Sequence, residues 1–171
     1  MRLFPAFCLA IVLATPAAAA DKPVQLGRFK DWSAMTAGTG ADKTCYALSQ
    51  PAASDPKGVA RGQIYFLISD FPSRKVKGEP QIVPGYAYPA NGTVNVTVGS
   101  DKWTFFTGNN GDNGGAWLKT RDDEAKLVAA MQKGSRMVVT GASARGTTTT
   151  DAYSLSGISA ALQKAHAECK M

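Results

Sequence analysis

The chain has 171 residues, a net charge of +6 at pH 7, three cysteines and one histidine. Its charges are spread along the sequence, and no basic block is long enough to form a nucleic-acid-binding tail. The composition therefore excludes nucleic acid as the expected partner and is typical of one domain with an ordinary charged surface.

The first twenty residues have the features of a secretory signal peptide. Arg2 gives a positive start, an apolar stretch too short to span a bilayer follows, and Ala18–Ala20 offer an A-x-A cleavage site. Cys8 lies within the apolar stretch and would be removed with it. We expect cleavage after Ala20, which leaves one domain of residues 21–171, without a transmembrane segment, in the periplasm or secreted.

Two cysteines, Cys45 and Cys169, remain in the mature chain. In an oxidising compartment a lone pair predicts a disulfide, which for so long a loop is worth roughly 4–5 kcal/mol in the chain-entropy model. The alternatives are a reactive thiol or a metal ligand, since His166 and Cys169 have H-x-x-C spacing. No third ligand is evident, so we expect no metal.

Strand patterns dominate most of the mature chain. The expected strands cover residues 29–36, 43–50, 63–69, 81–88, 93–98, 103–107, 116–119, 135–142 and 148–156. Residues 63–69 are apolar on both faces, which predicts a central strand packed on two sides. Pro84 makes residues 81–88 an edge or bulged strand, and the alternating valines of residues 93–98 begin the clearest hairpin.

Two helices complete the pattern. Residues 122–133 have an acidic first turn and an apolar stripe, and Gly134 is typical of the left-handed residue after a helix. A last helix from Ile158 places Cys169 on its buried stripe. About nine strands with one internal and one C-terminal helix predict a mainly β protein, an antiparallel β-sandwich.

The stretch "TGASARGTTTTDAYSLSG" raises the question of a nucleophilic serine. Its glycine spacing differs from G-x-S-x-G, strands flank it, and the one histidine lies in the last helix. We therefore interpret it as the last hairpin, with Arg145 at its turn the residue to mutate for function. No residue set in the sequence indicates catalysis or a cofactor, so we expect a non-enzymatic protein.

Several residues remain as candidates for binding. Arg74, Lys75 and Lys77 form a basic cluster that could contact an anionic partner, although a solvated loop is the simpler interpretation. Residues 108–115 ("GNNGDNGG") could hold a cation or ligand, but a glycine-rich turn between strands fits better. The aromatic residues that could stack on sugar are interpreted as core. They are Trp32, Trp103, Trp117, Tyr86 and Tyr88.

Several motifs together resemble the invasion-associated locus B (IalB) family of exported bacterial proteins. They are "DWSAMT", "CYALSQP", "KGVARGQIYFLISDFP" and "GSRMVVTGASARGTTTTDAYSLSGISAAL", followed by a terminal cysteine. The resemblance covers residues 29–169 and is most specific over residues 134–162. Many members carry extra cysteines that are absent here, so it implies the single pair Cys45–Cys169. It also implies a periplasmic or secreted protein without an established enzymatic activity.

The leading hypothesis is thus a non-catalytic envelope protein that acts by binding an unknown protein or an envelope or host-surface partner. The alternatives are a periplasmic glycan- or anion-binding module, and an envelope stress or maintenance factor unrelated to invasion.

Overall fold

The computed structural model describes residues 22–171, so the expected signal peptide lies outside the described residues. The strands are β1 (Val24–Phe29), β2 (Trp32–Ala37), β3 (Thr44–Ser49), β4 (Ala53–Asp55), β5 (Tyr65–Phe71), β6 (Val76–Val83), β7 (Thr93–Val98), β8 (Asp101–Asn110), β9 (Asn113–Trp117), β10 (Arg136–Ala142) and β11 (Thr148–Ser154). The helices are α1 (Arg121–Lys133) and α2 (Ile158–Cys169), with 3-10 turns η1 (Gly40–Asp42) and η2 (Pro72–Arg74).

These strands form one antiparallel sheet in the order β1-β2-β3-β5-β6-β9-β8-β7-β10-β11-β4. The mainly β, antiparallel class with two helices is confirmed. The described sheet has eleven strands rather than about nine, and the β-sandwich is not confirmed, because these strands make one continuous sheet. One cause is β1, which precedes the expected first strand of residues 29–36; Lys30, with a positive φ of 53°, turns the chain between β1 and β2. Another is β4, which lies in an expected loop.

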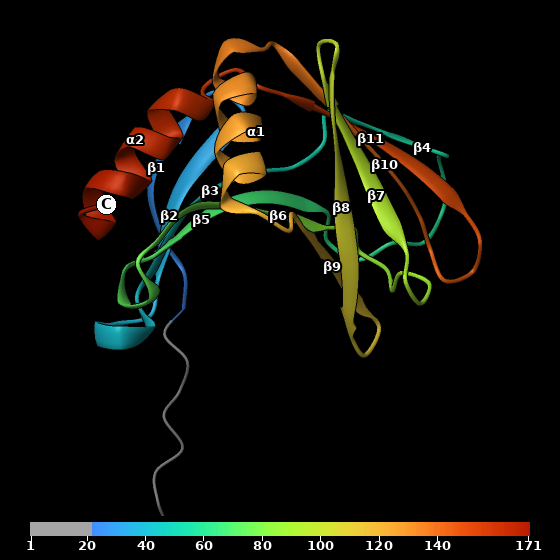
Figure 1. Ribbon diagram of the computed structural model, residues 1–171, viewed down its shortest axis with the longest axis horizontal. Helices are drawn as coiled ribbons and strands as arrows, with labels where there is room; N and C mark the ends of the chain where they lie inside the picture. Colours follow the sequence, from blue (N-terminus) through green and yellow to red (C-terminus); the bar gives the residue numbers. More distant parts are fainter. Residues whose placement is uncertain (1–21) are drawn as a thin grey trace, which may run out of the picture.

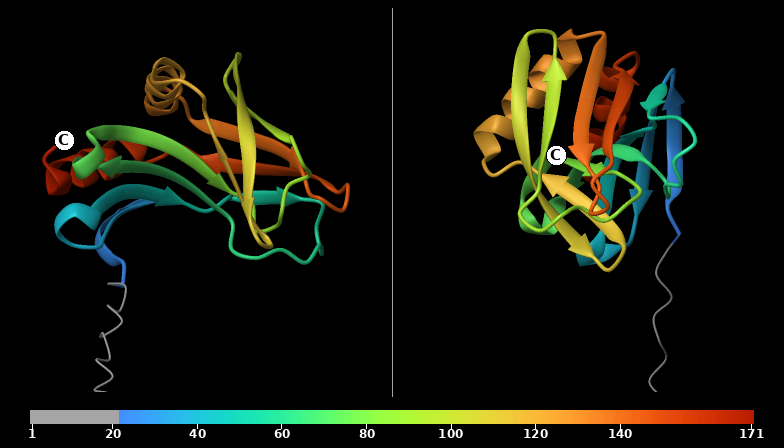
Figure 2. Two further views of the ribbon diagram at one scale, coloured as in Figure 1. Left: turned by 60° about the horizontal axis from the view of Figure 1, so that its bottom comes forward. Right: turned by 90° about the vertical axis from the view of Figure 1, so that its right-hand side faces the viewer.

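The sheet bends where β6 meets β9. Only two residue pairs, Gln81 with Trp117 and Ile82 with Ala116, join these strands. The bend divides the sheet into a first arm (β1, β2, β3, β5, β6) and a second arm (β9, β8, β7, β10, β11, β4), as Figures 1 and 2 show. Phe66 of the first arm packs edge-to-face on Phe105 of the second, with ring centroids 6.4 Å apart. The two arms therefore share one core.

Both helices bury their apolar stripes in this fold. α2 packs on β1, β2 and β3, and α1 packs chiefly on β6. Thr120 caps α1, because its hydroxyl accepts a hydrogen bond from the Asp123 N–H at 3.1 Å. Gly134 is not left-handed, since its φ is −84°. A Cβ there would lie 2.8 Å from Val98, so Gly134 is needed for close packing.

Two strand expectations need correction. Within β5, Phe66 and Ile68 are buried, whereas Tyr65 and Leu67 on the other face are only half-buried. The strand is central in the sheet but is packed fully on one face. β6 ends before Pro84 and lies between β5 and β9, so it is not an edge strand. Pro84 ends the strand because it has no N–H for a further ladder bond.

The far end of α2 is fixed to the first arm by a disulfide. Cys45 on β3 is bonded to Cys169, the pair that the sequence predicted. Beside it, the His166 imidazole donates to the buried Asp70 carboxylate at 2.6 Å, and Lys43 pairs with Glu168 at 2.8 Å. Among residues 22–171, no helix is both long and apolar enough to cross a membrane.

Candidate ligand-binding site

A cleft of about 480 Å³ opens at the end of the second arm, beside the β10–β11 turn. We call it the end cleft. Its lining residues come from four separate segments of the chain. They are Val59, Ala60, Arg61, Gly85, Tyr86, Ala87, Asp112, Ser143, Ala144, Arg145, Thr147 and Thr149. The β10–β11 hairpin therefore forms part of the wall of this cleft.

A buried ion pair fixes another part of the cleft wall. Arg61, in the long segment between β4 and β5, donates from Nη1 and Nη2 to the two carboxylate oxygens of Asp151 at 2.8 and 2.7 Å. Its Nε and Nη2 also donate to the Pro84 carbonyl at 2.9 and 2.7 Å. The two side chains are only 7% and 5% exposed. This fork-to-fork geometry fixes three segments at the cleft.

Tyr86 lies against this ion pair. The Arg61 guanidinium is 5.0 Å from the centre of the Tyr86 ring, a cation–π contact. The Tyr86 and Thr149 hydroxyls are hydrogen-bonded at 2.7 Å. Burial raises the pKa of the Tyr86 phenol, although the Thr149 hydrogen bond opposes the shift. The phenol is thus protonated at neutral pH and is a hydrogen-bonding group rather than a base.

The β10–β11 turn is held by its own hydrogen bonds. Ser143 is buried, and its hydroxyl accepts from the Thr147 N–H at 3.2 Å. The Ala144 N–H donates to the Ala87 carbonyl at 2.8 Å, which joins the turn to the next segment of the cleft. Arg145 is exposed at the tip. The turn thus presents a flexible cation from a fixed backbone.

The end cleft does not have the groups of a serine hydrolase. Its lining contains one carboxylate, that of Asp112, and no histidine. His166 is in α2, hydrogen-bonded to Asp70. Ser143 therefore has no base beside it in this lining, and the chemistry available is hydrogen bonding and charge pairing.

The structure separates the sequence-predicted binding residues. Arg145 lies at the end cleft, whereas Arg74, Lys75 and Lys77 surround the η2–β6 turn of the first arm, on the opposite side of Figure 1. All four side chains are exposed. The Arg74 guanidinium lies 3.9 Å above the Phe71 ring, which limits its freedom to reach a partner.

The glycine-rich segment differs from the expected loop. Residues 108–115 are mostly strand, and only Gly111 and Asp112 turn the chain between β8 and β9. The Asn109 side chain accepts from the Tyr88 N–H and donates to the Tyr88 carbonyl, both at 2.8 Å. It is a structural bridge. Within residues 22–171 no group of three His, Cys, Asp or Glu side chains could hold a metal.

Sequence reasoning missed the pairing of Arg61 with Asp151, because the two residues are 90 positions apart. A signal for it exists in β11. Thr149, Asp151 and Tyr153 share the inward face of that strand, and each is buried. A carboxylate at such a position needs a basic partner. The sequence therefore indicated that a partner exists, but not which residue provides it.

Comparisons with known proteins agree with this fold. The family model of the invasion associated locus B (IalB) protein matches residues 32–166. The crystal structure of invasion associated protein B from Bartonella henselae is similar, with a TM-score of 0.58 and 16% identity over 86% of this chain and 99% of the other. No curated protein matches the sequence significantly.

Proposed function

Because this chain belongs to the invasion associated locus B (IalB) family, we propose that it is an exported, non-catalytic bacterial envelope protein that acts by binding a host or envelope partner. The observation that carries the proposal is the end cleft. There the β10–β11 turn presents Arg145 beside a wall fixed by the Arg61–Asp151 pair. A fixed wall with one free cation suits recognition, because little freedom is lost when a partner binds.

Export is supported by the disulfide between Cys45 and Cys169, since such bonds persist in oxidising compartments. We propose that residues 1–20 are cleaved as a signal peptide and that residues 21–171 are one mature domain, periplasmic or secreted. Mass spectrometry of the natural protein tests this directly. The proposal requires an N-terminus at Asp21 and no thiol that reacts without reduction. A chain that retains residues 1–20, or that has two free thiols, would overturn it.

The chemistry of the end cleft supports binding rather than catalysis. Arg145 is its exposed cation, so the contacting part of the partner should carry a carboxylate, phosphate or sulfate group. The same cation supports the alternative of a small anion- or glycan-binding module. Arg74, Lys75 and Lys77 are proposed as a second contact, which would need an extended partner because they lie on the other arm.

Quantitative capture from the bacterial envelope tests the binding proposal. Purified residues 21–171 are immobilised, as wild type, as Arg145→Ala and as Lys164→Ala, a matched control on the exposed side of α2. We expect one or a few specific envelope components to be lost with Arg145→Ala and kept with Lys164→Ala. Equal recovery on all three proteins would contradict the proposal. A thermal shift with small anions but no captured macromolecule would favour the module.

A further inference from the structure

An aromatic pair lies on the outer face of the sheet, away from the end cleft. Phe106 of β8 and Trp117 of β9 are directly opposite each other across the two strands. Phe105 points inward to the core that also contains Leu127 of α1, so Phe106 points outward. Phe106 is 40% exposed and Trp117 is half-buried. Among residues 22–171, neither ring belongs to the hydrophobic core cluster or is among the residues packed against it.

The glycines of the β8–β9 hairpin explain the position of the indole. Gly108 and Gly115 are cross-strand partners on the same outer face. A Cβ at Gly115 would lie 2.4 Å from Trp117 Cη2, and a Cβ at Gly108 would lie 3.3 Å from Trp117 Cζ3. Any other residue at Gly115 would displace the ring. The indole therefore lies across this pair, in the space that two absent side chains leave on the sheet.

The two rings are neighbours with a tilted arrangement. Their centroids are 6.0 Å apart and their planes are inclined by 35°. The cross-strand row ends in uncharged polar residues, with Gln81 of β6 beside Trp117 and Thr93 of β7 beside Phe106. The neighbouring pair of Asn95 and Thr104 is hydrogen-bonded at 3.2 Å. Along this row the aromatic faces are thus bordered by neutral amides and hydroxyls, and the next positions of the same alternation, Glu79 and Lys119, carry opposite charges.

This composition selects the kind of occupant. Two aromatic side chains offer at most about 500 Å², below the roughly 800 Å² per partner of a stable protein interface. The row is uncharged, and Glu79 and Lys119 beyond it have opposite charges, so this surface does not complement an anionic lipid or a phosphate. A neutral sugar fits both the small area and the absence of net charge. Its C–H face packs on the electron-rich ring, and its hydroxyls pair with amides and hydroxyls.

We infer that Phe106 and Trp117, with Gln81 and Thr93 beside them, form a binding site for a neutral saccharide. The site is separate from the end cleft and needs neither export nor Arg145 to function in vitro. Its failure is therefore distinguishable from failure of the proposed envelope role. It also gives the glycines of "GNNGDNGGAW" a purpose beyond turning the chain.

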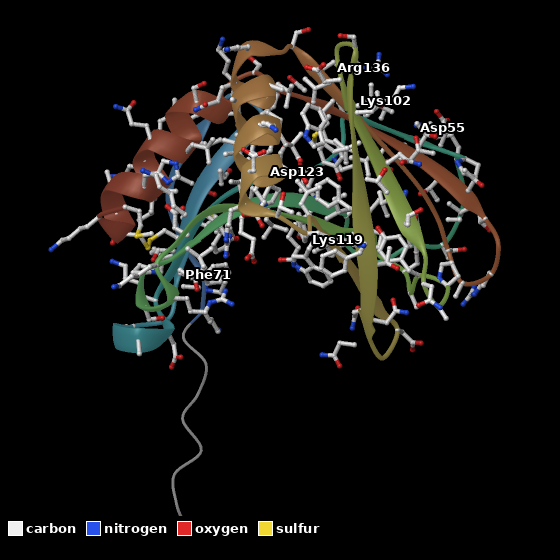
Figure 3. All side chains as sticks on the ribbon, viewed as in Figure 1. Asp55, Phe71, Lys102, Lys119, Asp123 and Arg136 are labelled. Atoms are coloured by element: carbon white, nitrogen blue, oxygen red, sulfur yellow. A yellow bond between two sulfur atoms is a disulfide. The ribbon has the colours of Figure 1, made fainter. Side chains whose placement is uncertain are left out.

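The test uses residues 21–171 with maltotriose, cellotriose and chitotriose as probes, read by saturation-transfer NMR and by tryptophan fluorescence. Trp117→Ala and Phe106→Ala remove a ring, whereas Gly115→Ala keeps both rings but displaces the indole. Phe71→Ala is the matched control, since Figure 3 places Phe71 well away from Lys119, which follows β9. Circular dichroism and melting temperature verify folding of each variant.

We expect at least one trisaccharide to bind the wild type. Trp117→Ala should weaken its affinity by about tenfold or more, Gly115→Ala should weaken it as well, and Phe71→Ala should leave it unchanged. Absence of saturation transfer from all three probes at millimolar concentration would overturn the inference. So would equal binding by wild type and Trp117→Ala, or a dimer without saccharide binding that Trp117→Ala dissociates.

Discussion

Two buried aspartates, one at each end of the molecule, show how differently the two arms are held. Asp70 is 1% exposed and Asp151 is 3% exposed, and each depends on one basic side chain from a distant segment. Asp70 meets His166 and the Gly78 N–H, next to the disulfide. Asp151 meets Arg61 through two parallel hydrogen bonds, and the end cleft opens beside them.

The two ends therefore differ in how they are secured. At the α2 end, a covalent bond and two polar pairs secure one helix to the first arm. At the end cleft, the ion pair secures a long segment, and Arg145 remains exposed on the adjacent turn. Stability is therefore shared between the ends, and the cleft end keeps an exposed cation on a turn that is fixed by its own hydrogen bonds.

The largest effect is expected at Arg61. Arg61→Leu leaves the Asp151 carboxylate buried without its partner, which should lower the free energy of unfolding by about 3–5 kcal/mol. The double variant Arg61→Leu/Asp151→Leu removes both charges and should recover much of that loss. Urea denaturation at pH 7 measures both values. A double variant as unstable as the single one would show that Arg61 acts through its other contacts.

Removal of the disulfide should have the next largest effect. The bond closes a separation of 124 residues, and the Cys45→Ala/Cys169→Ala variant should lose about 2–5 kcal/mol of unfolding free energy. Comparison with wild type in denaturant, without reductant, gives the difference. Stability that is unchanged would mean that the polar pairs alone secure α2.

Replacement of His166 should lower the unfolding free energy less than loss of Arg61 or of the disulfide. His166→Ala leaves the Asp70 carboxylate with the Gly78 N–H alone, and the expected loss is about 1–3 kcal/mol. Hydrogen exchange should show faster opening at the C-terminal turn of α2, while the β10–β11 hairpin keeps its protection. Equal acceleration of hydrogen exchange in α2 and in the β10–β11 hairpin would contradict the conclusion that the two ends are secured separately.

Replacement of Tyr153 should give a small gain in stability rather than a loss. Its hydroxyl is buried and has no hydrogen-bond partner among the described residues. Tyr153→Phe removes an unpaired polar group from the core while keeping the ring, so stability should stay level or rise by about 1 kcal/mol. A loss of more than this in thermal unfolding would show that the hydroxyl does have a partner in solution.

Local pattern was sufficient for some of these features. The spacing of Ile158 and Cys169 on one helical stripe predicted that α2 would carry the cysteine inward, and both residues are buried. The hairpin around Arg145 followed from alternation on each side of a small-residue turn, and β10 and β11 do pair there. Both features depend on residues that are close in sequence.

The other features depend on distant partners, so the local pattern misled. In the sequence, Gly108 and Gly115 are typical of turn residues. The structure shows that both are strand residues that leave space for the Trp117 ring. The single sheet depends on the short β6–β9 pairing, which no strand pattern specifies. Trp117 was interpreted as core, because half-burial on an outer face has the same alternation as full burial on an inner one.

The central claim is that the Arg145 turn at the end cleft contacts the partner, whereas the exposed side of α2 does not. Site-specific photo-crosslinking in the living bacterium tests it most directly, with a benzophenone residue in place of Ala144, which is exposed beside Arg145 in the cleft lining, or of Lys164 on α2. The account predicts a discrete crosslinked product from position 144 and none from position 164. The same product from both positions, or a product from position 164 alone, would contradict it.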